Sequence, residues 1–147
     1  MEKPVAVQTV LFLCNGNSCR SQMAEAIVNA RHSGWRAFSA GVQPAGYVHP
    51  LAVRVLDEIG IHHTGESKSV DEFRGRAFDR VITVCDEANE QCPVWLGGGM
   101  RLHESFPDPA RATGTEEQRL LAFRQVRDAI IEKLPGLLGE SPVQRAR

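Results

Sequence analysis

Residues 9–28 read TVLFLCNGNSCRSQMAEAIV, and the rest of the chain is organised around this stretch. It begins with an apolar run that predicts a buried strand over residues 9–14, and it continues into a predicted helix over residues 20–32. A tight polar loop joins the two. In this arrangement the free N–H groups and the positive dipole end of a helix face one point, where an oxyanion binds. The stretch therefore predicts an oxyanion-binding loop.

The side chains of this loop suit a nucleophile beneath a bound anion. Cys14 opens the loop, and Arg20 closes it with a guanidinium that can hold two oxygens of a tetrahedral anion. Gly16 is expected to supply a backbone turn that a residue with a Cβ resists. A thiolate among such N–H groups is stabilised as an anion, and Ser21 can donate a further hydrogen bond to it. The residues expected to bind the oxyanion are Asn15, Gly16, Asn17, Ser18, Cys19 and Arg20.

A purely structural interpretation of these residues also exists. Cys-x5-Arg is by itself a weak pattern, and Cys14 at the end of an apolar strand also fits a small buried hydrophobe. What favours catalysis is the complete octet of residues 14–21, set between a strand and a helix. Cys19, inside the loop, is interpreted as structural, while Asn17 and Glu25 are expected to brace the loop.

Length and composition indicate one domain over residues 1–147, with a mobile tail from about residue 136. The formal net charge of -1 provides no basic field that would recruit nucleic acid or an anionic membrane. No apolar stretch is long enough for a signal peptide or a membrane span. We therefore expect a cytoplasmic protein that binds neither nucleic acid nor membrane.

The chain has four cysteines, namely Cys14, Cys19, Cys85 and Cys92. In a cytosolic protein, cysteines act in catalysis or metal binding more often than in a disulfide framework. The spacings within the two pairs differ from the two-residue spacing of zinc ribbons and fingers. A structural zinc site is therefore the weaker interpretation, and we predict no metal.

Further elements follow along the chain. Strands are predicted over residues 35–40, 80–84 and 100–103, and helices over 50–59, 70–76, 86–91 and 116–134. Pro135 and Gly136 are expected to end the last helix. His62 and His63 suggest a metal site, but neighbouring residues of an extended segment point in opposite directions. We interpret both as solvent-facing.

Strands that alternate with helices predict an α/β domain with a parallel sheet. In such sheets, ligands bind outside the carboxyl ends of the strands. Cys14 and Cys85 each end a predicted strand, and Asp108 lies in the loop after the fourth strand. These three residues are therefore expected on one rim of the sheet.

With these motifs in place, the chain resembles the arsenate reductases built on the low-molecular-weight tyrosine phosphatase fold. The residues that carry the resemblance are 14–25, Val84-Cys85, Cys92-Pro93 and Phe106-Pro107-Asp108-Pro109. The phosphatase branch has Pro where this chain has Gln22, and Tyr where it has Ala110. The family fold implies a four-stranded parallel sheet in the order 2-1-3-4, with helices on both faces.

The resemblance implies a mechanism in which Cys14 attacks arsenate and Asp108 donates a proton to the departing oxygen. Cys85 and then Cys92 form successive disulfides that release arsenite. The implied electron donor is thioredoxin, with glutaredoxin or a small thiol as alternatives, and no cofactor is bound. The resemblance thus implies a monomeric enzyme of arsenic detoxification.

Two other functions compete with this one. The first is a low-molecular-weight protein tyrosine phosphatase, because the loop is shared. The second is a non-enzymatic, thiol-rich module that binds metal or arsenic. Some relatives also bind potassium near Asn17 through a carboxylate whose position Lys68 occupies in this chain. Since the ammonium of Lys68 can replace the ion, no potassium requirement is expected.

Overall fold

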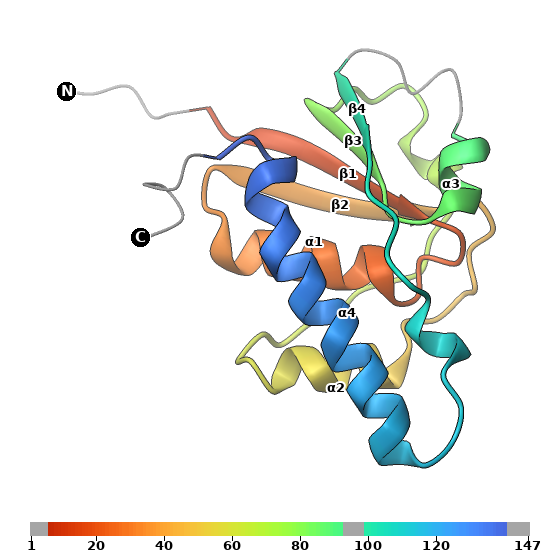
Figure 1. The fold of residues 1–147 in the computed structure, drawn as a ribbon. Coiled ribbons are helices and arrows are strands. Elements are labelled where there is room, and N and C mark those ends of the chain that lie inside the picture. Colours follow the sequence, from red (N-terminus) through yellow and green to blue (C-terminus); the bar gives the residue numbers. More distant parts are fainter. Residues whose placement is uncertain (1–5, 93–98, 141–147) are drawn as a thin grey trace.

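The computed structural model of the protein describes residues 6–92 and 99–140. Its four strands form one parallel sheet in the order β2-β1-β3-β4 (Figure 1). The strands are β1 (Gln8–Cys14), β2 (Trp35–Gly41), β3 (Arg80–Thr83) and β4 (Met100–His103). The predicted fold class and strand order are thereby confirmed.

Strand β1 lies at the centre of the sheet and is apolar along its length. Residues 10–13 are fully buried, because a central parallel strand is covered on both faces. The register pairs Cys14 with Gly41 on β2 and Leu13 with Thr83 on β3. The carboxyl ends of β1 and β3 therefore lie side by side, so Cys14 and Cys85 share one rim, as predicted.

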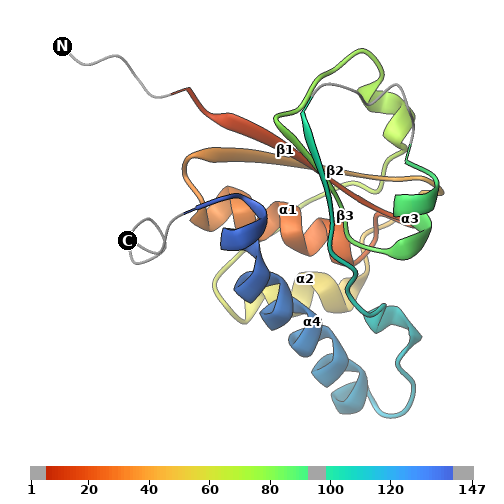
Figure 2. The ribbon, with the colours of Figure 1, turned by 45° about the horizontal axis from the view of Figure 1, so that its top comes forward.

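The main helices gather on one side of the sheet, as Figures 1 and 2 show. They are α1 (Arg20–Arg31), α2 (Pro50–Asp57) and α4 (Glu116–Leu137). The short helix α3 (Asp86–Glu90) follows the carboxyl end of β3. Two 3-10 helices, η1 (Val70–Phe73) and η2 (Pro109–Arg111), lie in the connections that flank β3 and β4.

Neighbouring side chains of β2 serve the two faces of the sheet. Ser39 turns toward α1, where its hydroxyl donates to the Glu25 carboxylate at 2.9 Å. Phe38 points to the opposite face and packs against Phe73 and Phe78, with ring centroids 5.9 and 5.6 Å away. The segment that carries η1 therefore covers the face of the sheet opposite to α1, α2 and α4.

Helix α4 continues beyond the position at which we expected it to end. Pro135 lies inside the helix, which extends to Leu137. Proline removes only one helical hydrogen bond, and the buried side chains of Leu134 and Leu138 hold this turn against the core. Glu140 then contacts His32 at 2.7 Å. Leu138 and Glu140 thus contact the rest of the domain, in the region where we expected a mobile tail to begin. Residues 93–98 and 141–147, for which we also made predictions, lie outside the described residues.

A cluster of charged side chains joins α2 to α4. Arg124 donates to both carboxylate oxygens of Glu58, with a shortest distance of 2.7 Å. Arg127 donates to the same carboxylate at 3.0 Å and to the Val55 carbonyl at 2.8 Å. The hydrogen bonds from Arg124, followed by those from Arg127, lower the pKa of Glu58 to about 2.

This cluster predicts a pH-dependent contribution to stability. Because the folded-state pKa of Glu58 is lowered, its contribution is complete above the ordinary value of 4.5 and is lost as the pH falls toward 2. The melting temperature of Glu58→Gln should therefore lie below that of the parent protein at pH 7, and the gap should close near pH 2. Glu116→Gln, which removes an exposed ion pair with Arg54, is the control. A gap that stays constant with pH would contradict this account.

Candidate active site

Cys14 is the last residue of β1, and its buried sulfur lies among hydrogen-bond partners. The Asn17 N–H donates to Cys14 Sγ at 3.2 Å, and Ser21 Oγ lies 2.8 Å from the same sulfur. Asn17 Nδ2 donates to Ser21 Oγ at 2.7 Å, which leaves the hydroxyl hydrogen for the sulfur. The structure thus brings the predicted nucleophile and the predicted thiolate-stabilising residue together, and their catalytic roles stay predictions.

Asn17, rather than Gly16, provides the unusual backbone conformation of the loop. Asn17 has a φ of 50°, in the left-handed region, whereas Gly16 does not have a positive φ. A Cβ on Gly16 would meet nothing closer than 3.6 Å. Our expectation for Gly16 was therefore wrong. Asn17 sustains the conformation because its side-chain oxygen accepts from the Lys68 N–H at 2.9 Å, in addition to its bond with Ser21.

Gly41, at the end of β2, is a residue of the site that sequence reasoning missed. A Cβ at this position would lie 2.7 Å from the Asn15 carbonyl oxygen and 3.1 Å from Asn17. The following backbone runs along the loop, since Val42 N–H donates to the Cys14 carbonyl and Gln43 N–H donates to the Asn15 carbonyl. Gly41 therefore allows the backbone of β2 to approach the loop closely. In the sequence, this role is indicated only by a glycine at the end of a predicted strand.

Arg20 and Asp108 approach one another across the rim. Arg20 Nη1 donates to the Phe106 carbonyl at 3.1 Å, and Arg20 Nη2 lies 3.8 Å from Asp108 Oδ2. Arg111 Nε is also 3.8 Å from this oxygen, and Asp108 Oδ1 accepts from the Ala110 N–H at 3.0 Å. The structure therefore brings the predicted acid to the predicted anion-binding guanidinium, with a carboxylate fixed by the start of η2.

Cys85 is fully buried beside the loop. Burial is the main cause that raises the pKa of the Cys85 thiol, and negative charge on Cys14 acts in the same direction. Hydrogen bonds from the Ala88 and Asn15 N–H groups and the charge of Arg20 oppose the rise. Cys85 thus shares its surroundings with the nucleophile and the predicted guanidinium clamp.

Cys92 lies farther out and is half-buried. Arg101 Nη1 donates to Cys92 Sγ at 3.3 Å. Burial raises the pKa of the Cys92 thiol, and the charge and hydrogen bond of Arg101 lower it.

All four cysteines are free thiols, so the structure corresponds to the fully reduced protein.

Cys19 differs from the other three cysteines in its electrostatic environment. Burial, followed by the charge of Asp108, raises the pKa of the Cys19 thiol to about 12, despite a hydrogen bond from Ser18. A thiol with this pKa stays protonated near neutrality, and a protonated thiol is a poor nucleophile. This environment agrees with the structural interpretation of Cys19.

Gln22 and His63 form a buried support behind the loop that we did not predict. Gln22 Nε2 donates to the Asn17 carbonyl at 3.1 Å and to the Glu66 carbonyl at 2.8 Å, and Gln22 Oε1 lies 2.8 Å from His63 Nε2. The side chain of His63 is 9% exposed, whereas that of His62 is 82% exposed. Our solvent-facing prediction was wrong for His63, because an extended segment that turns one side chain outward turns the next one inward.

The positive charge of Lys68 acts on the Glu25 carboxylate near Asn17, and the absence of a potassium requirement stays a prediction. Burial raises the pKa of Glu25 and lowers that of His63, and the positive charge of Lys68 acts to lower the pKa of both groups. Glu25 Oε1 already accepts from Ser39 at 2.9 Å. An ammonium next to this carboxylate would repel a further cation.

Within residues 6–92 and 99–140, no group of three or more His, Cys, Asp or Glu side chains is arranged to hold a metal ion. None of the helices within residues 6–92 and 99–140 is both long and apolar enough to cross a membrane.

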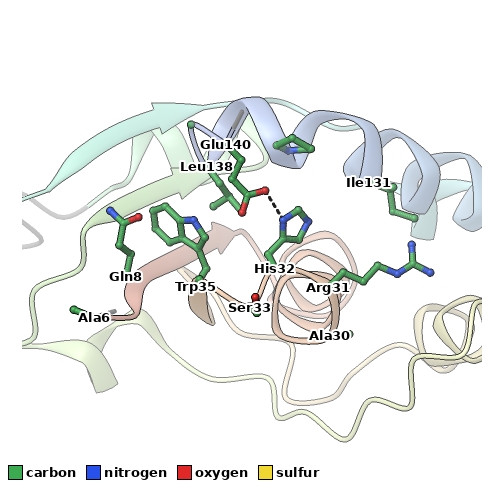
Figure 3. Close-up of a pocket in the computed structure, with 13 residues that line it drawn as sticks. Ala6, Gln8, Ala30, Arg31, His32, Ser33, Trp35, Ile131, Leu138 and Glu140 are labelled. Atoms are coloured by element: carbon green, nitrogen blue, oxygen red, sulfur yellow. Dashed lines mark hydrogen bonds and ion pairs between the residues drawn. The ribbon is translucent and has the colours of Figure 1, made fainter. Parts of the chain in front are cut away.

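A hollow of about 870 Å³ lies at the opposite end of the sheet, near the first residues of β1 and β2 (Figure 3). Its lining includes Gln8, Trp35 and the ion pair between His32 and Glu140. No cysteine is among its lining residues, and ligands of parallel sheets bind at the carboxyl ends of the strands. Despite its size, this hollow is therefore separate from the candidate active site.

Comparison with known proteins links this geometry to a family. The family model described as low molecular weight phosphotyrosine protein phosphatase matches residues 9–146. An arsenate reductase of Halalkalibacterium halodurans is 40% identical over 130 residues, which cover 86% of this chain and 92% of that protein.

Two solved structures show the same fold. One, described as an arsenate reductase in the phosphate binding state, is 30% identical with a TM-score of 0.76 and covers 90% of this chain and 98% of that one. An arsenate reductase from Archaeoglobus fulgidus is 34% identical with a TM-score of 0.74 and covers 89% of this chain and 99% of that one. The match therefore extends over nearly the whole described domain.

The contact between β2 and the loop predicts the effect of one added methyl group. Gly41→Ala should push the Asn15 carbonyl aside and misalign the N–H groups that face the anion. Loss of one or two such hydrogen bonds should weaken phosphate binding about tenfold. Calorimetric titration with phosphate measures this. Gly34→Ala is the matched control, because a Cβ there meets nothing within 4 Å, and equal affinity in the two variants would refute the role of Gly41.

Proposed function

This chain belongs to the low molecular weight phosphotyrosine protein phosphatase family, and on that premise we propose that it reduces arsenate to arsenite through a relay of three cysteines. The observation that supports this most is the position of Cys85. A phosphatase needs only the loop cysteine, whereas here a second thiol is fully buried where the charges of Cys14 and Arg20 act on it, with Cys92 seven residues further along the chain. The relatives named arsenate reductase point to the same chemistry.

Arsenate is a tetrahedral oxyanion that fits the N–H groups of the loop, with Arg20 holding two of its oxygens. The Cys14 thiolate attacks arsenic, and one oxygen leaves as water after Asp108 has supplied a proton. The 3.8 Å contact between Arg20 and Asp108 supports this step, because it keeps the acid next to the anion site.

Reduction then needs two electrons, which thiols supply. The Cys85 thiolate attacks the Cys14 sulfur, so that the Cys14–Cys85 disulfide forms and the electron pair of the sulfur–arsenic bond remains on arsenic. Arsenic leaves as arsenite. Cys92 next attacks Cys85, the Cys85–Cys92 disulfide forms, and Cys14 leaves as a thiolate. The disulfide thereby moves away from the anion site.

The reaction implies an external reductant for the Cys85–Cys92 disulfide. We propose thioredoxin, with glutaredoxin or a small thiol as alternatives. Because the relay starts from reduced thiols, the proposal includes a reducing compartment such as the cytoplasm, a monomeric enzyme and a role in arsenic detoxification. A protein tyrosine phosphatase is the second candidate, favoured by the loop that both activities share.

The three thiols generate the first prediction of this function. Cys14→Ser and Cys85→Ser should form no arsenite, whereas Cys92→Ser should release one equivalent and then stop, because its oxidised form cannot be recycled. Arsenite is measured after addition of arsenate to the reduced protein, and multiple turnover is followed by NADPH oxidation through thioredoxin and its reductase. Hydrolysis of 4-nitrophenyl phosphate is the control. If the parent protein forms no arsenite and hydrolysis of 4-nitrophenyl phosphate is lost only in the Cys14 variant, the protein is a phosphatase instead.

The helix between the two outer cysteines generates a second prediction. In helix α3 the Asn89 N–H donates to the Cys85 carbonyl at 3.2 Å. Helix α3 spans Asp86–Glu90, so most of the segment between the two cysteines is helical. A fully helical step of seven residues separates two Cα atoms by about 10 Å, whereas a disulfide requires less than about 7 Å. We therefore expect α3 to unwind when Cys85 and Cys92 pair.

Amide hydrogen exchange of the reduced and oxidised forms tests this prediction. Exchange over residues 86–91 should become at least about tenfold faster on oxidation, while the amides of α1 keep their protection. Cys92→Ser treated in the same way should show no change over 86–91. Equal protection of this segment in the reduced and oxidised parent protein would exclude the unwinding.

A further inference from the structure

One face of the segment that follows β3 is attached to β3 and β4. Asp86 and Asn89 are three residues apart in α3, so the helix turns them toward one side. Cys92 follows the end of α3 and contacts β4 as well. Each meets a different strand residue. The contacts are His103 Nε2 with Asp86 Oδ1 at 3.1 Å, Thr83 Oγ1 with Asn89 Oδ1 at 3.3 Å, and Arg101 Nη1 with Cys92 Sγ at 3.3 Å.

Arg101 and His103 occupy alternate positions of β4, so their side chains project from the same face of the strand. The two residues, together with Asn89 and Cys92, line a hollow of about 210 Å³ between the strands and α3. The Cys92 sulfur therefore lies at a hollow whose wall carries a guanidinium. This arrangement gives Arg101 access to the sulfur that is third in the relay.

We propose that Arg101 is the positioning residue for Cys92: its guanidinium holds the Cys92 sulfur beside β4 and stabilises the thiolate that attacks Cys85 once Cys85 has become part of the first disulfide. The inference rests on the proposed function for the identity of the reaction. The contact between Arg101 and Cys92 is independent of that function and can be tested without arsenate.

The chemistry of the second exchange requires such a residue. Only the thiolate form of Cys92 attacks a disulfide sulfur, and its proton is released to solvent. In the exchange, the Cys92–Cys85 bond forms, the Cys14–Cys85 bond breaks and its electron pair leaves with Cys14. No net oxidation occurs, so this step needs no further reactant.

The charges around Cys92 single out Arg101. Burial raises the pKa of the Cys92 thiol, and the Arg101 guanidinium acts against burial. From β3, the hollow receives the uncharged Val81 and Thr83. Among the described residues that line the hollow, His103 is the other titratable side chain besides Cys92 and Arg101, and its imidazole contacts the Asp86 carboxylate of α3. A guanidinium is suited to this task because it stays charged at all relevant pH values and offers several N–H donors.

The same interaction also favours the release of α3 after the exchange. Once Cys92 is bonded to Cys85, its sulfur carries no negative charge, and the charge-assisted hydrogen bond to Arg101 is lost. One of the three contacts that attach the segment to the strands is thereby removed at the stage where the helix must unwind. Arg101 thus stabilises the reduced conformation selectively.

The pH dependence of Cys92 alkylation tests the contact directly. The reduced full-length protein is treated with iodoacetamide at a series of pH values, and Cys92 labelling is quantified by peptide mass spectrometry. In Arg101→Gln the midpoint should rise by about one pH unit, so that labelling at pH 7 slows about tenfold. In Arg101→Lys, which retains the positive charge, the midpoint should lie close to that of the parent protein. Arg54→Gln, at a surface arginine on α2, is the charge-loss control.

A rapid-quench experiment tests the consequence for the relay. After one equivalent of arsenate is added, the delay between arsenite release and the appearance of the Cys85–Cys92 disulfide should lengthen about tenfold in Arg101→Gln at pH 7. The delay should shorten as the pH rises. An unchanged midpoint in the alkylation series, or an unchanged delay, would overturn the inference. Failure of the parent protein to form arsenite would instead refute the proposed function and leave the alkylation result as the test of Arg101.

Discussion

The site depends on the convergence of the Asn17 N–H and the Ser21 hydroxyl on the Cys14 sulfur, at the junction of β1 and α1. This convergence requires a left-handed residue in the loop, and Asn17 adopts that conformation only because its side chain bonds both to Ser21 and to the backbone of Lys68. The helix dipole and the N–H groups then act on the same point without moving during the reaction. Every other part of the site is arranged around this junction.

Burial separates the four thiols into distinct roles. Cys19 is held protonated by its desolvated position, while Cys85 and Cys92 are each buried next to groups that counteract the cost of a charge. A buried thiol is inert until a cation or an N–H group stabilises its thiolate. In this protein, the positive charge of Arg20 opposes the rise in the pKa of Cys85, and that of Arg101 opposes the rise in the pKa of Cys92. In the proposed relay, two arginines on different elements would therefore act on successive steps.

The support behind the loop shows why local sequence patterns have limits. His63 follows an exposed histidine in a segment without regular structure. Nothing in the sequence of that segment indicates that the His63 imidazole contacts Gln22 of α1. The expectation for Gly16 was wrong for a related reason. A glycine can adopt a positive φ, but its presence in the sequence does not show that the fold uses that conformation. Pro135 was expected to stop a helix, yet the packing of Leu134 and Leu138 outweighs the single hydrogen bond that proline removes.

The amino-acid sequence alone determined the parallel α/β architecture, the order of its elements, and the loop with Cys14, Arg20 and Ser21, because hydrophobic period and short-range spacing encode these features. It also placed Cys85 and Asp108 on the correct rim, since strand ends meet there in any parallel sheet. Only the tertiary structure decided that Gly41 supports the loop, that His63 turns inward and that Arg101 contacts Cys92. Each of these contacts joins different elements across the fold, and their distances depend on how the helices and strands pack together.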